Sequence, residues 1–257
     1  MENKKSLLKA ISNFLEEFGE IVFFIKETFS LMFKRPYRIH LLIQQMYFVG
    51  IGSIFIVLLT GFFSGAVFTL ESAIAFAMFG ADGLVGSTVI ISITREIGPV
   101  FCALMVTGRA ASAMATELGT MRVSEQIDAM DTLAVLPIQY LVVPRVLAGF
   151  IMLPILTFLF DLVGVLGTYT VAIHFLDIDK GIFWHKIWWY LDPDDIYSGL
   201  IKAAFFGLTL SILGCYKGFN ASGGARGVGV ATTQAVVASS VAIFILDYIL
   251  TLVMFST

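Results

Sequence analysis

Five long apolar stretches, separated by short polar segments, dominate the pattern of this chain. An α-helix needs roughly 20 residues to cross about 30 Å of hydrocarbon, and each stretch is long enough. The stretches cover residues 46–70, 84–107, 146–175, 196–216 and 231–255. This pattern predicts an all-α integral membrane protein with a single domain, residues 1–257, and five transmembrane helices.

The N-terminal segment, residues 6–33, has a different pattern. Apolar residues recur at steps of three and four, the period of one helix face. Glutamates and lysines lie between them too often for a transmembrane helix, which favours an amphipathic helix in the membrane interface. A helix packed on a soluble partner is the alternative. The apolar positions are Leu7, Ile11, Leu15, Phe18, Val22 and Ile25.

Composition supports a membrane protein, and the basic residues predict its orientation. Hydrophobic residues make up 58% of the chain and charged residues 14%, whereas soluble domains have about 45–50% and about 25%. Twelve Lys and Arg residues lie on one side of the predicted spans, against Lys180 and Lys186 on the other. Because basic residues favour the cytoplasmic side, we expect the N-terminus in the cytoplasm and the C-terminus outside.

Two connections between spans have patterns of their own. The longest cytoplasmic connection, residues 109–145, has apolar residues at steps of three after Ser124, a candidate N-cap. We expect a short cytoplasmic helix at about residues 124–134, ended by Pro137. The outer loop after the third span is rich in aromatic residues, which suit an interfacial anchor. These are Trp184, Trp188, Trp189 and Tyr190.

The pair Arg95-Glu96 lies inside the second apolar stretch. Ionisable side chains at membrane depth cost a few kcal/mol each on insertion scales, so they face a partner or a wet cavity. Adjacent helical residues diverge by about 100°, so we expect the two to have different roles. Pro99 cannot donate to the carbonyl of Arg95, which predicts a kink beside the pair. The alternative to a functional site is an ion-pair network that only fixes helix packing.

Other residues inside the spans are expected to be structural. Lys202 and Asp247 both fall in the outer half of a span, where pairing would lower the cost of each. Asp161 has no obvious partner in the sequence. The spacing Gly61-x-x-x-Gly65 allows close helix approach and is compatible with self-association.

Motifs of catalytic or metal sites are absent from the sequence. The chain lacks His-Glu-x-x-His and Gly-x-Ser, and its three histidines have no metal-ligand spacing. The glycine-rich residues 223–229 lack the Gly-Lys-Ser/Thr ending of a nucleotide-binding loop. We therefore expect neither an enzyme nor a bound cofactor, metal or nucleic acid, and any ATP would bind to a separate subunit.

The second span and the loop after it carry a resemblance to a known family. Residues 95–100 read Arg-Glu-Ile-Gly-Pro-Val, and residues 107–127 read Thr-Gly-Arg-Ala-Ala-Ser-Ala-Met-Ala-Thr-Glu-Leu-Gly-Thr-Met-Arg-Val-Ser-Glu-Gln-Ile. These motifs closely resemble the MlaE/YrbE permease family, the membrane subunits of ABC transporters that work with MCE-domain proteins. The similarity extends over essentially the whole chain.

The resemblance implies an assembly and a cargo. It implies a homodimer of this chain on a dimeric ABC ATPase, a STAS-domain protein on that ATPase, and a hexameric MCE protein on the outer face. The implied cargo is phospholipid, moved between a bacterial inner membrane and the MCE tunnel in a Gram-negative envelope. This traffic would maintain the lipid asymmetry of the outer membrane.

The resemblance also implies roles for individual residues. The cargo pocket, between two copies near the first two spans, would contain Arg95, Glu96, Ile97, Phe68, Phe76 and Phe79. The residues facing the ATPase would be Glu117, Gly119, Glu125, Asp128 and Met130. Pro99, like Lys202 and Asp247, is expected to be structural. Glu71 departs from the family pattern, because better-known members tend to have a neutral polar residue there.

Two hypotheses of different classes follow. The leading one is a lipid-transport permease, because a charged pair at mid-membrane beside large apolar side chains suits an amphiphile. A permease for another hydrophobic cargo, such as a sterol or a solvent, is a variant of it. The other hypothesis is a scaffold that only anchors an ATPase and MCE complex in the membrane.

Overall fold

The computed structural model describes residues 2–255 of the chain, with side chains for residues 16–254, and all its regular elements are helices. Five helical segments are long and apolar enough to cross a membrane: residues 39–77, 82–123, 138–174, 193–219 and 224–254. The predicted all-α membrane class is therefore confirmed. Each segment is longer than its apolar stretch, because helices continue into polar sequence beyond the hydrocarbon core.

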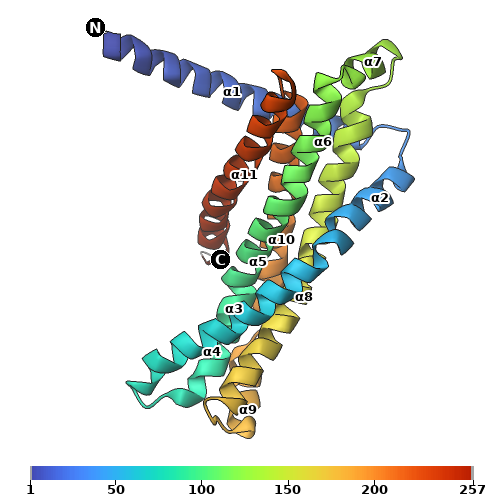
Figure 1. Ribbon diagram of the computed structural model, residues 1–257. Helices are drawn as coiled ribbons and strands as arrows, with labels where there is room; N and C mark the ends of the chain where they lie inside the picture. Colours follow the sequence, from blue (N-terminus) through green and yellow to red (C-terminus); the bar gives the residue numbers. More distant parts are fainter. Residues whose placement is uncertain (1, 256–257) are drawn as a thin grey trace.

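The five spans form a bundle in which most are built from more than one helical piece (Figure 1). The first span consists of α2 (Ile39–Val49) and α3 (Ile51–Ala77). The third is the π-helical turn η4 (Ile138–Val142) followed by α8 (Val143–His174). The fourth is α10 (Pro193–Phe219) and the fifth is α11 (Gly224–Phe255).

The second span is the most interrupted. Its pieces are, in order, η1 (Asp82–Leu84), α4 (Val85–Ser92), η2 (Ile93–Ile97), α5 (Gly98–Val106), η3 (Thr107–Ala111) and α6 (Ser112–Val123). Both η2 and η3 are π-helical turns. π-helical turns inside α-helices often occur at functional sites.

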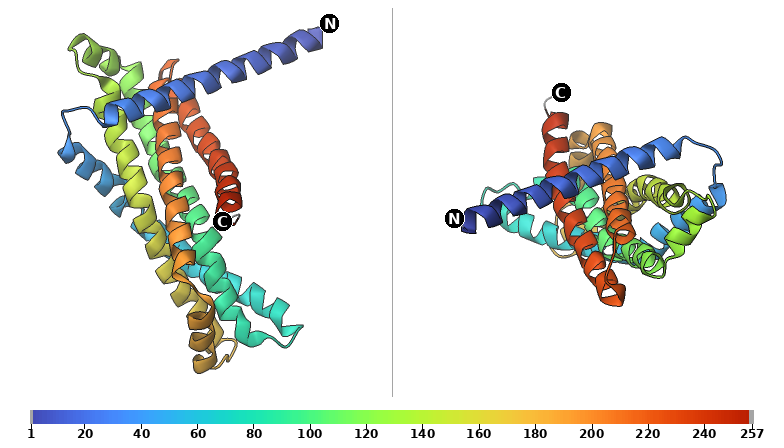
Figure 2. Two further views of the ribbon diagram at one scale, coloured as in Figure 1. Left: turned by 180° about the vertical axis from the view of Figure 1, so that it is seen from behind. Right: turned by 90° about the horizontal axis from the view of Figure 1, so that it is seen from above.

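Three further helices lie at the two ends of the bundle. The helices α1 (Glu2–Met32) and α7 (Gln126–Thr132) lie at one end, and α9 (Lys180–Tyr190) lies at the other (Figure 1). Seen from above, α1 crosses over the ends of the bundle helices (Figure 2). Its Phe24 is buried and packs edge-on against Tyr216 of α10, with ring centroids 5.6 Å apart. The position of α1 in a membrane interface stays a prediction.

The short helix after the second span begins later than predicted, and Ser124 is not its N-cap. Because α6 continues to Val123, Ser124 closes that helix instead, and its Oγ donates to the carbonyl of Thr120 at 2.7 Å. Glu125 then reverses the chain with a φ of 59°. The helix α7 ends at Thr132, well before Pro137.

The first and third spans cross in close contact through glycines. A Cβ at Gly65 would lie 2.1 Å from the carbonyl oxygen of Gly164 in α8, and one at Gly61 would lie 2.8 Å from that of Phe160. Contacts this short are with backbone, so no side-chain rotation relieves them. The spacing Gly61-x-x-x-Gly65 therefore allows close packing of two helices within one chain.

Gly65→Leu should destabilise the protein by at least the roughly 1–3 kcal/mol typical of overpacking, because the helices must separate. The control is Gly229→Leu in α11, where a Cβ would meet nothing within 4 Å. Thermal unfolding in detergent, followed by size-exclusion chromatography, measures both. Equal midpoints for the two variants would contradict the close crossing.

Candidate functional site

The pair Arg95-Glu96 lies in the π-helical turn η2, near the middle of the second span. At the end of this turn the backbone N–H of Gly98 donates to the carbonyl of Ile93, five residues earlier. Pro99, the next residue, has no N–H to donate. The backbone irregularity that Pro99 predicts is therefore a widened helical turn, and this turn contains both Arg95 and Glu96.

Each member of the pair has a different partner on α10. Arg95 Nε lies 3.4 Å from Asp195 Oδ1, near the start of α10, and Glu96 Oε2 lies 2.5 Å from Lys202 Nζ. The two partners are about 10 Å apart along the helix, given the α-helical rise. Both charges thus pair with the same helix, and the expectation that Arg95 and Glu96 have different roles stays a prediction.

Lys202 is the centre of a polar network that joins three spans. Its side chain is only 2% exposed, and its Nζ donates to Glu96 and, at 2.6 Å, to Thr251 Oγ1 of α11. Asp247 Oδ1, also on α11, lies 3.3 Å from the same ammonium. The pairing of Lys202 with Asp247 suggested by the sequence is therefore present. Together with Arg95 and Asp195, the network contains one more carboxylate than cations.

An open apolar groove lies along α3 and the second span, next to the widened turn. It has a volume of about 400 Å³, and Ile97, which directly follows Glu96, contributes to its wall. Ion network and groove thus meet at the π-helical turn η2. The lining residues are Phe63, Ser64, Val67, Phe68, Glu71, Ile97 and Phe101.

The structure separates the residues predicted to bind cargo into three places. Phe68 and Ile97 line the groove. Arg95 and Glu96 face α10 in the adjoining network, each side chain still about a third exposed (35% and 37%). Phe76 packs against the core, and Phe79, at 84% exposure, lies at the end of α3.

Several residues of the site were not singled out from the sequence, among them Val67 and Phe101 of the groove. Asp195 belongs to the capping box that starts α10, a signal visible in the run Asp192-Pro193-Asp194-Asp195. Thr251 lies four residues after Asp247, which places both on one helix face. Ser64 gives no signal in the sequence.

The residues predicted to face the ATPase lie in or near α6 and α7. Glu117 pairs with the buried Arg145 of α8 at 2.8 Å, and Gly119 is buried against the α10–α11 connection. Asp128 pairs with Arg122 at 2.5 Å, and Glu125 is exposed. Met130 is partly buried against the core. Glu117, Glu125 and Asp128 are the exposed members of the set.

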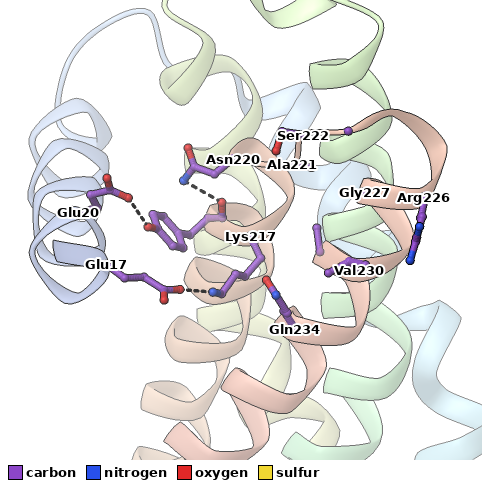
Figure 3. A pocket seen from close by; sticks show the side chains of 13 residues that line it. Glu17, Glu20, Lys217, Asn220, Ala221, Ser222, Arg226, Gly227, Val230 and Gln234 are labelled. Atoms are coloured by element: carbon purple, nitrogen blue, oxygen red, sulfur yellow. Dashed lines mark hydrogen bonds and ion pairs between the residues drawn. The ribbon is translucent and has the colours of Figure 1, made fainter. Parts of the chain in front are cut away.

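A polar hollow of about 510 Å³ lies between α1 and the α10–α11 connection (Figure 3). Tyr216 donates to Glu20 at 2.9 Å, and Lys217 pairs with Glu17, so two side chains of α10 hold α1 to the bundle. Asn220 donates back to the Tyr216 carbonyl. This hollow is separate from the network around Lys202.

Five spans, an ion network inside the bundle and an adjoining apolar groove define a polytopic membrane protein with a candidate site between its helices. A family model described as Permease MlaE matches residues 42–253. The chain therefore belongs to the MlaE permease family.

Named relatives align with 83–97% of the chain. A probable ABC transporter permease of Rickettsia conorii is 43% identical over 246 residues, which are 96% of this chain and 95% of the relative. A probable ABC transporter permease of Synechocystis is 43% identical over 213 residues, 83% and 81% of the two chains. The intermembrane phospholipid transport system permease protein MlaE of Haemophilus influenzae is 34% identical over 258 residues, 97% and 96% of the two chains.

Lys202→Met should destabilise the protein by about 3 kcal/mol, because it leaves two carboxylates facing each other without a cation. Adding Glu96→Gln and Asp247→Asn in the same chain should restore most of the loss, since the repelling charges are then removed. Unfolding midpoints in detergent measure both, with Lys180→Met at the start of α9 as the control. A triple variant no more stable than Lys202→Met would contradict the role of the network.

Proposed function

We propose that the chain is the membrane subunit of an ABC transporter that moves phospholipid between the bacterial inner membrane and a periplasmic MCE tunnel. In a Gram-negative envelope this traffic maintains the lipid asymmetry of the outer membrane. Family membership and the phospholipid-transport naming of the Haemophilus relative support the proposal. The subunit itself carries no catalysis, because ATP is bound and hydrolysed by a separate subunit.

The observation that carries this proposal is the meeting of an apolar groove with a charged network at one helical turn. Phospholipids have an anionic phosphate and long acyl chains. The groove offers Phe68 and Ile97 to the chains, and Arg95 lies two residues from Ile97. A phosphate that enters competes with Asp195 for the Arg95 guanidinium, since charge-assisted bonds to phosphate are among the strong ones.

The open shape of the groove supports assembly as a homodimer. Phe63, Val67 and Phe101 line it with exposures of 57%, 55% and 43%. Large exposed apolar patches mark interaction or ligand sites. A second copy of this chain on the groove would enclose a lipid between two subunits. A dimeric ATPase, a STAS-domain protein on that ATPase and an MCE hexamer complete the proposed complex.

The proposed orientation places the N-terminus in the cytoplasm and the C-terminus in the periplasm. The helices α1 and α7 share one end of the bundle, which is the end with the predicted excess of basic residues (Figure 1). Tryptophans and acidic residues lie at the other end, around α9. Basic residues favour the cytoplasmic side and aromatic residues favour interfaces.

A different hydrophobic cargo is the alternative within the same mechanism. Glu71 is an acidic residue in the groove wall, and it would repel an anionic headgroup placed beside it. A sterol or a solvent avoids this repulsion. A non-transporting scaffold is the further alternative, and the next experiment distinguishes it from a transporter.

Arg95→Gln should lower phospholipid transfer to the MCE partner about tenfold or more in a reconstituted complex. The loss corresponds to the roughly 1.5–3 kcal/mol of a hydrogen bond to a charged group. Arg95→Lys, which keeps the charge, should recover part of the rate. Unchanged transfer by an assembled Arg95→Gln complex would exclude the role of Arg95, and a wild-type complex without transfer would favour the scaffold.

Glu125→Arg combined with Asp128→Arg should weaken co-purification of the ATPase, if α7 is the coupling helix. Asp128→Arg also breaks its ion pair with Arg122, so the control is Asp128→Arg with Arg122→Glu, which re-forms a pair of opposite sense. Pull-down of the ATPase compares the two variants. Full recovery of ATPase by the first variant would count against α7 as the contact.

A further inference from the structure

An apolar hollow lies at the joint between α1, α2 and the start of the third span. Its volume is about 280 Å³, and it lies at the end of the bundle that carries α1 and η4, remote from the groove on α3. Side chains of all three elements form its interior. The apolar lining residues are Leu31, Met32, Pro36, Ile39, Leu42, Val143, Pro144 and Leu147.

The polar residues of this hollow are basic or neutral. Lys34 and Arg38 line the hollow, and among the described residues no Asp or Glu lines it. Arg38 stacks on the ring of Tyr140, with Cζ 4.3 Å from the centroid. Gln139 Nε2 donates to the Lys34 carbonyl at 2.8 Å, which ties the connection to the third span.

One nitrogen of the Arg38 side chain lacks a hydrogen-bond acceptor. Its Nη1 is buried and has no hydrogen-bond partner in the part of the chain that the structure describes. A buried donor without an acceptor is costly, and guanidinium groups bind phosphate in charge-assisted pairs. The hollow therefore combines an apolar interior with a guanidinium whose Nη1 lacks an acceptor.

We propose that this hollow binds one acidic phospholipid of the cytoplasmic leaflet. The phosphate lies between Lys34 and Arg38, and a segment of one acyl chain fills the space between Leu42 and Leu147. Basic pockets between transmembrane helices on the cytoplasmic side are suited to anionic headgroups. The site differs from the cargo groove and holds its lipid whether or not the protein transports.

The alternatives fit the hollow less well. A soluble anion would satisfy Arg38 and leave the apolar interior unfilled. A neutral lipid would fill the interior and leave the cations without an anionic partner. An acidic phospholipid satisfies both, and the connection of α1 to α2 would then be fixed by a lipid.

The test measures retained lipid. The complex is assembled in bilayers of about four parts phosphatidylcholine to one part phosphatidylglycerol, extracted in mild detergent and examined by native mass spectrometry. Lys34→Gln with Arg38→Gln should lower bound phosphatidylglycerol about tenfold. The control, Lys26→Gln with Arg35→Gln, removes the same charge from positions outside the lining and should retain it.

A second pair of variants tests the acyl chain. Leu42→Trp fills the hollow and should also release phosphatidylglycerol, whereas Ile43→Trp, exposed and outside the lining, should not. Equal loss in both charge variants means attraction to the surface alone and overturns the site. Retention in Leu42→Trp overturns the inserted chain, and loss in Arg95→Gln means that the retained lipid is cargo in the groove.

Discussion

The burial of one ammonium group, that of Lys202, constrains the arrangement of three of the five spans. A charge inside a membrane protein costs several kcal/mol unless partners surround it. The carboxylates that surround Lys202 come from the second and fifth spans, as Glu96 and Asp247. The fourth span must therefore lie between them. Gly199 permits this approach, because a Cβ there would lie 2.0 Å from the carbonyl oxygen of Thr94 in η2.

Arginines occur beside the irregular turns of the first three spans. Arg95 lies in η2, and Arg109 lies in η3 and donates to the carbonyl of Phe48 at 2.8 Å, beside the break between α2 and α3 at Gly50. Arg145 follows η4 and donates to the carbonyl of Leu141 at 2.6 Å. Arg109 and Arg145 thereby satisfy backbone carbonyls beside irregular turns, where the regular helical hydrogen bonds are interrupted. The turn η2 packs against α10 through Glu96 and Thr94, and its Ile97 also forms part of the groove wall.

The sequence predicts much of this fold and part of the site. Hydropathy identifies all five spans, because each apolar stretch must cross the same hydrocarbon thickness. The costly pair Arg95-Glu96 identifies two members of the network, and burial cost predicts the pairing of Lys202 with Asp247. The capping box of Asp195 is visible in the sequence, but its pairing with Arg95 joins two spans, and no local pattern reveals that pairing. The prediction that Ser124 is an N-cap was wrong, because local propensity does not show that α6 continues to Val123.

The proposed function requires that the groove beside η2 holds the acyl chains of a phospholipid. A phospholipid with a photoactivatable acyl chain, added to the reconstituted complex, tests this directly by mapping the labelled residues. We expect saturable labelling at Phe68 and Ile97 at low probe content, and labelling proportional to probe on the exposed face of α11 at Val237. Labelling at the groove that rises in proportion to probe, as at Val237, would contradict a specific lipid site.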